Sequence, residues 1–564
     1  MTKDEKGAVI LSTFKVYSLK KGVKMSKYYT SSEVKSVLDK YPRWQEKLYC
    51  RGFVLTNANV DWPLDQYPFY SNWNLIEFGS TIGNSFKLFI HKDAHFYSYS
   101  YDDVVFFMIG HAYNPYSMKW DEEELLKDLA LAYKKGHAEF WDMESELTGV
   151  FCLGFLTKNK LVFSTDCTGM QLVYHGVHKG HLFVTSHSKL VADFLGFEQT
   201  DYIRRLTNTW YWYMWGTYLP SDLSPYKELR RTNPNCCVLY SDEKVGIKRY
   251  YPTRKIEETK TSEEYNSTIH ELGRVMTNTM ELIAKKWPNK TAAISLTGGR
   301  DSLTTLACSH TVYDQFDYFS YISNSDESVD AYAARRICDA LGLQHKIIEI
   351  PSNDPLYSEL TVFKMILECN SGCVGETKEN EIRKRMYFCQ NPPCGVEVKS
   401  WVNEMGRAWF WNKFNKKRFP NKPSPSYLRA LYKVHFYPRL IRQTDQVYKE
   451  YMKKYLPLDI IGMLPWVEQF YWECGWSASE GQFLTAEHRM SFDITIPFNN
   501  RKYIETMLTV PLEMRKVDRI PIDLTELEEP RITKTGINIH DVSHTNFRAE
   551  LLKVYLTIFS KIKF

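Results

Sequence analysis

The sequence predicts an α/β protein with antiparallel sheets in its first half and a parallel sheet in its second half. Short β-rich runs dominate before residue 255, whereas strand-like and helix-like segments alternate after it. From about residue 360 onward, helical patterns dominate. A chain of 564 residues is also long enough for more than one core. We therefore expect two domains, residues 1–255 and residues 256–564.

The strands expected in the first half are short and apolar, and turn-forming residues such as those at 158–160 separate several of them. Hairpins of this kind are typical of an antiparallel sheet. The expected strands are 53–56, 87–90, 104–108, 150–155, 161–163, 182–184 and 237–240.

The second half alternates strands and helices, a pattern typical of a parallel sheet covered on both faces. The expected order is helix 265–287, strand 292–296, a glycine loop and a helix, strand 318–322, helix 329–341 and strand 346–350. Two later segments are expected to be irregular, a loop at 420–426 and an acidic, proline-bounded turn at 521–530.

The composition excludes several classes of protein. Hydrophobic residues make up 44% and charged residues 25%, and a net charge of +5 is too small to indicate a nucleic-acid-binding surface. No apolar run approaches the roughly 18 residues of a membrane span, and the amino terminus is unlike a secretory signal. We therefore expect a cytoplasmic protein whose 12 cysteines are reduced thiols. A zinc site is the alternative for four of them, Cys369, Cys373, Cys389 and Cys394.

A short glycine-containing loop links the strand at 292–296 to a helix. Its two glycines have no Cβ to obstruct a phosphate, and the N–H groups of a helix start attract anions. Thr297 and Ser302 add hydroxyl donors, and Asp301 is placed to hold Mg²⁺. The loop therefore predicts an ATP pyrophosphate-binding site, and a glycine turn with a capped helix is the alternative. The expected ATP contacts are Leu296, Thr297, Gly298, Gly299, Asp301 and Ser302.

This arrangement resembles the asparagine synthetase family of ATP pyrophosphatases, which adenylate a carboxylate and then form an amide. Asp326-Glu327, followed by Ala331, Ala334, Leu341-Gly342 and His345, is similar to the stretch that closes over the adenosine in that family. The resemblance implies an adenine-nucleotide α-hydrolase-like synthetase domain with a helical C-terminal part. It also implies that Tyr321, Asp326 and Ser400 contact the nucleotide. Helix capping is the alternative role for Asp326.

The resemblance extends upstream. The segments 147–186, 233–235 and 249–251 look like the family's glutaminase-type domain and its exit, which implies an antiparallel β-sandwich of the Ntn type for residues 1–255. A working glutaminase of this family needs Cys directly after the initiator Met. Residue 2 is Thr, and Cys50 could serve only if the residues before it were removed. We expect this domain to be inactive and Cys50 to pack at a strand start.

The family's acidic, glycine-rich metal loop is most similar to residues 398–407. In that match Asn403 replaces a metal-binding Asp and Glu404 is retained. The resemblance therefore implies a Mg²⁺ site of Asp301, Asn403 and Glu404, with Glu397 as a further ligand candidate. An ordinary amphipathic helix is the alternative for this segment.

Two later segments carry further candidate sites. Arg515, Lys516 and Arg519 resemble the family's C-terminal cations, which would stabilise negative charge on the adenylate and the tetrahedral intermediate. A solvated surface charge is the alternative for each. The aromatic and basic run at 409–419 predicts an amphipathic helix with aromatic anchors, or a docking surface for a peptide or a nucleic acid.

Three functions remain open at this point. The first is an ATP- and Mg²⁺-dependent ligase that joins a small-molecule or peptide carboxylate to an amine, similar to β-lactam synthetases and lasso-peptide cyclases, with Asp301 and Glu404 as catalytic residues. The second is amidation of an amino acid or a sugar uronate with ammonia, free or from a partner protein. The third, motivated by Asn403, is a weakened nucleotide-binding regulatory protein. Membrane and nucleic-acid partners are not expected.

Overall fold

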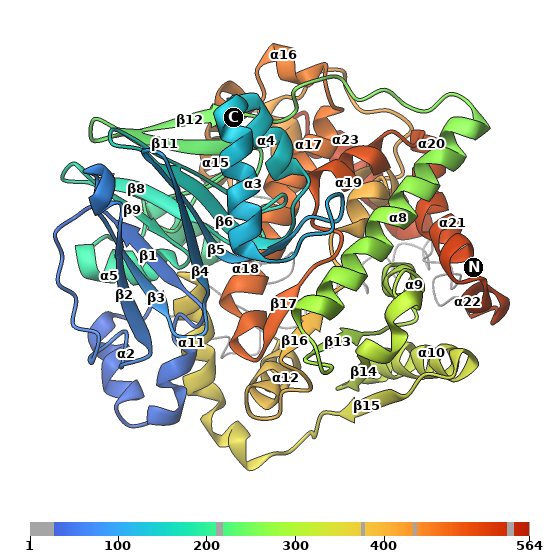
Figure 1. The fold of residues 1–564 in the computed structure, drawn as a ribbon, viewed down its shortest axis with the longest axis horizontal. Helices are drawn as coiled ribbons and strands as arrows, with labels where there is room; N and C mark the ends of the chain where they lie inside the picture. The colour runs from blue at the N-terminus through green and yellow to red at the C-terminus, as the bar shows by residue number, and fades with distance from the viewer. Residues whose placement is uncertain are drawn as a thin grey trace, which may run out of the picture.

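The computed structural model describes residues 28–562, with gaps at 210–211, 213–217, 374–377, 433–436 and 538–545. Thr2 therefore lies outside the described residues. Two antiparallel sheets occupy the left of Figure 1, and a parallel sheet with its helices lies at the lower right. Helices form most of the C-terminal part. This α/β architecture confirms the predicted fold class.

The antiparallel half consists of two six-stranded sheets that share one apolar core. Their orders are β10-β8-β9-β1-β3-β2 and β12-β11-β7-β6-β5-β4. Leu55 and Leu88 from the first sheet and Phe107 and Phe163 from the second belong to the same buried cluster, as a β-sandwich requires. The strands are β1 (Phe53–Thr56), β2 (Trp73–Phe78), β3 (Phe86–His91), β4 (Phe96–Tyr101), β5 (Val104–Tyr113), β6 (Thr148–Leu156), β7 (Leu161–Thr165), β8 (Tyr174–His178), β9 (His181–Thr185), β10 (Arg230–Arg231), β11 (Cys236–Ser241) and β12 (Lys244–Arg249).

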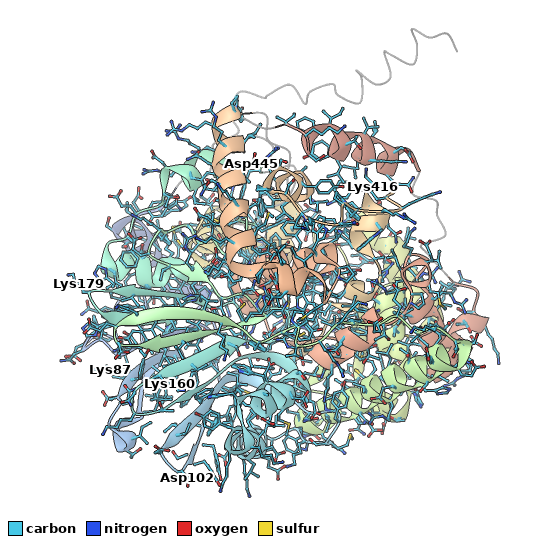
Figure 2. All side chains as sticks on the ribbon, turned by 90° about the horizontal axis from the view of Figure 1, so that it is seen from above. Lys87, Asp102, Lys160, Lys179, Lys416 and Asp445 are labelled. Atoms are coloured by element: carbon cyan, nitrogen blue, oxygen red, sulfur yellow. The ribbon has the colours of Figure 1, made fainter. Side chains whose placement is uncertain are left out.

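Each strand predicted in the first half is present. The turn at 158–160 joins β6 to β7 in a hairpin, and the turn residues Asp102, Lys160 and Lys179 lie at the periphery in Figure 2. Strands β2, β4, β8, β10 and β12 were not predicted. The edge strands β4 and β12 consist of exposed or half-buried residues and lack the apolar run by which the predicted strands were recognised.

Helices cover the outer faces of both antiparallel sheets. Helices α3 (Glu122–Lys135) and α4 (His137–Ser145) pack on the sheet that contains β5 and β6. The other sheet is covered by α2 (Ser31–Leu38), α5 (Ser188–Leu195) and α11 (Leu360–Ser371). Because α11 comes from the second half of the chain, the two halves share a core.

The parallel sheet has the order β15-β14-β13-β16-β17, and all its neighbouring pairs are parallel. Its strands are β13 (Ala292–Ser295), β14 (Asp317–Ile322), β15 (His345–Glu349), β16 (Val396–Val398) and β17 (Asp493–Thr495). The first three confirm predicted strands. Strands β16 and β17 were not predicted because three residues are too few to display a period.

The helices next to this sheet agree with the prediction except at two places. Helices α8 (Ser262–Lys286) and α9 (Arg300–Ala307) lie where expected, whereas α10 (Ser325–Leu341) begins earlier because Asn324 caps it. The irregular turn predicted at 521–530 is wrong, because α21 (Arg519–Glu528) covers most of it. Pro521 is tolerated in the first helical turn, where its missing N–H would have had no intrahelical partner.

The remaining helices belong mainly to the C-terminal part. They include α6 (Asp201–Thr207), α12 (Glu379–Gln390), α13 (Trp409–Lys413), α14 (Pro425–Tyr432), α15 (Pro438–Tyr455), α17 (Trp466–Phe470), α18 (Ser477–Ala486), α19 (Arg501–Leu508), α22 (Pro530–Lys534) and α23 (Asn546–Phe559). The loop predicted at 420–426 is confirmed up to the start of α14. Over the described ranges, no helix combines the length and apolar character needed to cross a membrane.

A buried carboxylate joins the antiparallel half to the helical part. Glu473 is fully buried in a π-helical turn (Tyr471–Trp476). It accepts hydrogen bonds from Arg249 at 2.7 Å, Asn233 at 2.9 Å, Asn235 at 3.0 Å and Tyr451 at 2.8 Å. Burial alone would raise the pKa of Glu473, but the charge of Arg249 and these donors hold it below the usual range.

Replacing this carboxylate should destabilise the whole fold. Glu473→Gln leaves the Arg249 charge without its buried partner, and we expect the free energy of unfolding to fall by about 3–5 kcal/mol. Denaturant unfolding monitored by fluorescence and circular dichroism measures the loss. Glu513→Gln is the matched control, because the side chain of Glu513 is 79% exposed and should contribute little. Equal stability of the two variants would contradict a structural role for Glu473.

Candidate active site

A cavity of about 330 Å³ lies at the carboxyl ends of the parallel strands. Residues that end or follow β13, β14 and β16 line it, including Ser295, Ser320 and Lys399. The chain leaves β13 toward β14 on one side and later returns to β16 on the other. In open parallel sheets, ligands bind at this kind of reversal in strand order.

The loop after β13 is held by its own hydroxyl groups. The Ser302 hydroxyl lies 2.8 Å from the Thr297 carbonyl oxygen and accepts from the Thr297 N–H at 3.1 Å. The Thr297 hydroxyl accepts from the Gly299 N–H at 3.1 Å. Both hydroxyls were expected to contact a ligand. In this structure they shape the loop, and both residues line the cavity.

The start of α9 has features that suit an anion. No side chain caps this helix, and the N–H groups of a helix start carry partial positive charge. Gly299 has φ −79°, which any residue can adopt, so the missing Cβ matters for space rather than for conformation. The Gly298 N–H donates to Asp330 Oδ1 at 3.2 Å, so a carboxylate oxygen already accepts from the loop.

Asp301 forms the centre of a charged network. Its carboxylate accepts from Arg407 Nη1 and from Asn403 Nδ2, both at 2.8 Å. Arg407 also donates to Asp518 at 2.8 Å, and Arg300 lies 3.4 Å from the same carboxylate. The predicted metal-loop segment is therefore fastened directly to α9.

The backbone of that segment is strained. Val402 has φ 81° and Ala408 has φ 50°, both in the left-handed region, which is especially unfavourable for a β-branched residue. Between them a short 3₁₀ turn covers Asn403–Gly406 instead of the amphipathic helix that was the alternative for this segment. Strain of this kind persists only where the surroundings enforce it, and it clusters at functional sites.

Glu404 borders the cavity and carries an unusual charge state. Its Oε2 atom is buried and has no hydrogen-bond partner among the described residues. Burial, and then the negative charge of Asp301, raise the pKa of Glu404 to about 8. This carboxyl is therefore mostly protonated at neutral pH.

The donors at this corner of the cavity fit a magnesium ion. Asp301 and Glu404 supply carboxylates, and Asn403 Oδ1 is a buried oxygen without a partner in the described chain. Oxygen ligands of this kind suit Mg²⁺. Asn403 donates its amide N–H to Asp301 and is not among the residues lining the cavity, so Asp301 and Glu404 are the better-placed ligands. Glu397 instead lies 3.3 Å from Lys399 Nζ.

Two residues that the family resemblance connected with the nucleotide, Tyr321 and Glu327, line the cavity. Asp330 also lines it and was not selected by the sequence analysis. Glu327 pairs with Lys384 at 2.6 Å. Burial would raise the pKa of Glu327, but hydrogen bonds from Lys384 and Ser323 bring it below its usual value.

Lys399 supplies a cation at the cavity that sequence reasoning missed. It directly follows β16 and is buried, and its Nζ lies 4.7 Å from the centre of the Trp401 ring. Ser400 beside it also lines the cavity and accepts a hydrogen bond from Thr305 at 2.8 Å. The sequence could have indicated Lys399, because it lies in the segment 398–407. It was overlooked because the three-residue strand before it was not recognised.

The structure does not bring the other predicted site residues to the cavity. Asp326 is exposed at the start of α10 and does not line the cavity. Arg515 is buried against Glu468 at 2.6 Å. Lys516 and Arg519 pair with Glu513 and Asp523 near the surface. These three cations therefore have partners of their own away from the cavity.

The candidate cysteine sites are placed apart from this cavity. Cys50 is buried three residues before β1, and burial raises the pKa of its thiol, which disfavours a reactive thiolate. Within the described residues, the four cysteines considered for zinc do not form a cluster able to share a metal. The one such group found there is Cys50 with His91 and Asp93.

No family model matches the sequence. No curated protein matches it either. Among solved structures, the allosteric regulatory enzyme of purine biosynthesis matches with 10% identity and a TM-score of 0.23, covering 57% of this chain and 63% of the other. Glutamine phosphoribosylpyrophosphate amidotransferase from B. subtilis, complexed with ADP and GMP, matches with 11% identity and a TM-score of 0.21, covering 56% and 62%. The chain thus spans less than two thirds of either structure, and likeness this low supports no inference.

The raised pKa of Glu404 predicts a pH effect on stability. Because the folded state holds this proton up to about pH 8 while the unfolded chain loses it near the ordinary value of 4.5, the contribution of Glu404 to stability falls as pH rises between these values. Glu404→Gln should remove this decline, by up to about 1.4 kcal/mol per pH unit. Unfolding free energies measured from pH 5 to 8 test it. An unchanged slope in the variant would contradict the assignment.

Proposed function

We propose that this chain is an ATP-dependent ligase that activates a carboxylate as an acyl-adenylate and transfers the acyl group to an amine. The observation that carries the proposal is the cavity at the reversal in strand order. There the loop after β13, the uncapped start of α9, Lys399 and the acidic corner at Asp301 and Glu404 surround about 330 Å³. Anion-binding groups and metal-binding oxygens that line one cavity suit a magnesium nucleotide.

The proposed reaction has two steps. A carboxylate oxygen attacks the α-phosphorus of ATP, an O–P bond forms, and the bond to the β-phosphate oxygen breaks to release pyrophosphate. The amine nitrogen then attacks the acyl carbon, the bond to AMP breaks, and the nitrogen loses a proton. The chain would supply positioning and electrostatic stabilisation in both steps.

The residues of the phosphate loop and the acidic corner have distinct roles in this proposal. The Gly298–Gly299 backbone and the start of α9 would bind the phosphates, with Lys399 adding positive charge. Asp301 and Glu404 would hold Mg²⁺, which neutralises phosphate charge when bound. Ser302 keeps the loop in shape through its hydrogen bonds to Thr297.

The first test is pyrophosphate release. Asp301→Asn removes a proposed metal ligand, and we expect the release rate with ATP, Mg²⁺ and a carboxylate mixture to fall at least about 100-fold. Asp326→Asn is the matched control, because Asp326 was a predicted contact but lies exposed outside the cavity. It should keep the parent rate. Pyrophosphate release at the parent rate in a folded Asp301→Asn protein would exclude the mechanism. If the parent chain binds ATP but added carboxylates do not increase its pyrophosphate release, a regulatory nucleotide-binding protein would be favoured.

The second test measures nucleotide binding directly. Lys399→Met removes a cation that lines the cavity while keeping a long apolar side chain against Trp401. We expect the affinity for magnesium ATP, measured by calorimetry, to fall at least about tenfold, or 1.4 kcal/mol. Lys516→Met is the control, because Lys516 pairs with Glu513 away from the cavity. Equal losses in both variants would contradict a phosphate-binding role for Lys399.

A further inference from the structure

A second cavity of about 350 Å³ adjoins the first. Trp401 and Glu404 line both cavities, so the two meet at these side chains. Most other lining residues come from α13, α14, α18, α23 and the turn Tyr471–Trp476. A molecule bound here would lie next to the proposed site of acyl-adenylate formation.

The walls of this cavity are predominantly aromatic. Trp409, Tyr432, Tyr471, Trp476 and Tyr555 all line it. Trp409 is stacked with Tyr471, with ring centres 6.1 Å apart and planes inclined by 12°, yet remains 44% exposed. Aromatic faces are electron-rich and attract both apolar groups and organic cations.

Some aromatic residues of the run at 409–419 pack in the protein core, and others line this cavity. Phe410, Trp411 and Phe414 are buried in an apolar cluster, which confirms the anchoring role. Trp409 lines the cavity, and Phe414 borders it as well. Lys413 also lines it, with Nζ 5.6 Å from the centre of the Phe414 ring.

Two carboxyl groups face this aromatic surface. Glu404 and Glu480 both line the cavity, and neither forms an ion pair within the part of the chain that is described. Burial raises the pKa of Tyr471, and the charges of the nearby Glu404 and Glu480 raise it further. Glu480 accepts a hydrogen bond from Ser479 at 2.9 Å. Burial raises the pKa of Glu480 as it does that of Glu404, so an ammonium bound beside these two groups would favour their ionised forms.

We propose that this second cavity binds an organic ammonium whose body is aromatic or bulky and apolar, with its nitrogen at Glu404 and Glu480. The rings would contact the body and the two acids would pair with the nitrogen. A cavity of about 350 Å³ is much larger than ammonia needs and lies in the range of small-molecule sites. The binding follows from this cavity alone, whereas its role as the acceptor amine rests on the proposed function.

The test is calorimetric titration of the full chain, without nucleotide, with phenethylamine and with its uncharged analogue phenethyl alcohol. We expect the amine to bind at least about tenfold more tightly than the alcohol, and ammonium chloride at equal concentration to leave amine binding unchanged. Equal binding of amine and alcohol, or no amine binding up to about 10 mM, would overturn the proposal.

Variants locate the binding. Glu480→Gln should weaken phenethylamine at least about tenfold and leave phenethyl alcohol unchanged, because only the amine loses a charged partner. Trp409→Ala should weaken both ligands. Glu513→Gln, in an exposed pair, should change neither. An unaltered amine affinity in a folded Glu480→Gln protein would refute the proposed orientation.

Nucleotide binding separates this inference from the proposed function. Glu480 does not line the first cavity, so Glu480→Gln should bind magnesium ATP like the parent chain. If ATP binds and the amine does not, the inference fails alone. If the amine binds and ATP does not, the proposed function fails and the ammonium site stands.

Discussion

The buried Glu473 carboxylate is the interaction on which the rest of the architecture depends. It receives donors from the end of the antiparallel half, Asn233, Asn235 and Arg249, and from Tyr451 of the helical part. Because it lies within the turn Tyr471–Trp476, its hydrogen bonds fasten this turn to the antiparallel half. Tyr471 and Trp476 then form the aromatic wall, and the following helix α18 carries Glu480. The buried Glu473 thus holds in place the turn that supplies Tyr471 and Trp476 to the second cavity.

A second set of contacts holds the turn that carries Glu404, a residue that borders both cavities. The Arg407–Asp301 ion pair and the Asn403–Asp301 hydrogen bond tie the strained turn after Val402 to the first turn of α9. Glu404 lies within that turn, so these contacts keep its backbone next to the first turn of α9. Burial is the main cause of the raised pKa of Glu404, and the nearby charge of Asp301 is the second.

The sequence predicted features whose causes are local. The loop after β13 was recognisable because strand, glycines and helix follow one another directly in the sequence. The hairpin at 158–160 was recognisable because its two strands and its turn are also consecutive. Roles that depend on partners far away in the sequence could not be predicted from the sequence. Arg515 resembled a catalytic cation, but burial against Glu468 could not be read from either residue alone. Lys399 was overlooked because β16 is too short to display a period, and Pro521 suggested a turn although the first turn of a helix accepts proline.

Glu404 connects the two proposed sites because one carboxyl borders both cavities. With a pKa of about 8 it holds a proton at neutral pH, and a cation on either side favours its loss. The first cation to bind must therefore displace that proton, whereas a second cation meets a carboxylate that is already ionised. Against this gain stands the repulsion between the two cations, which water screens poorly where Glu404 Oε2 is buried. Coupling between magnesium nucleotide and organic ammonium is the difference between these two terms, and thermodynamic linkage makes it the same in both directions.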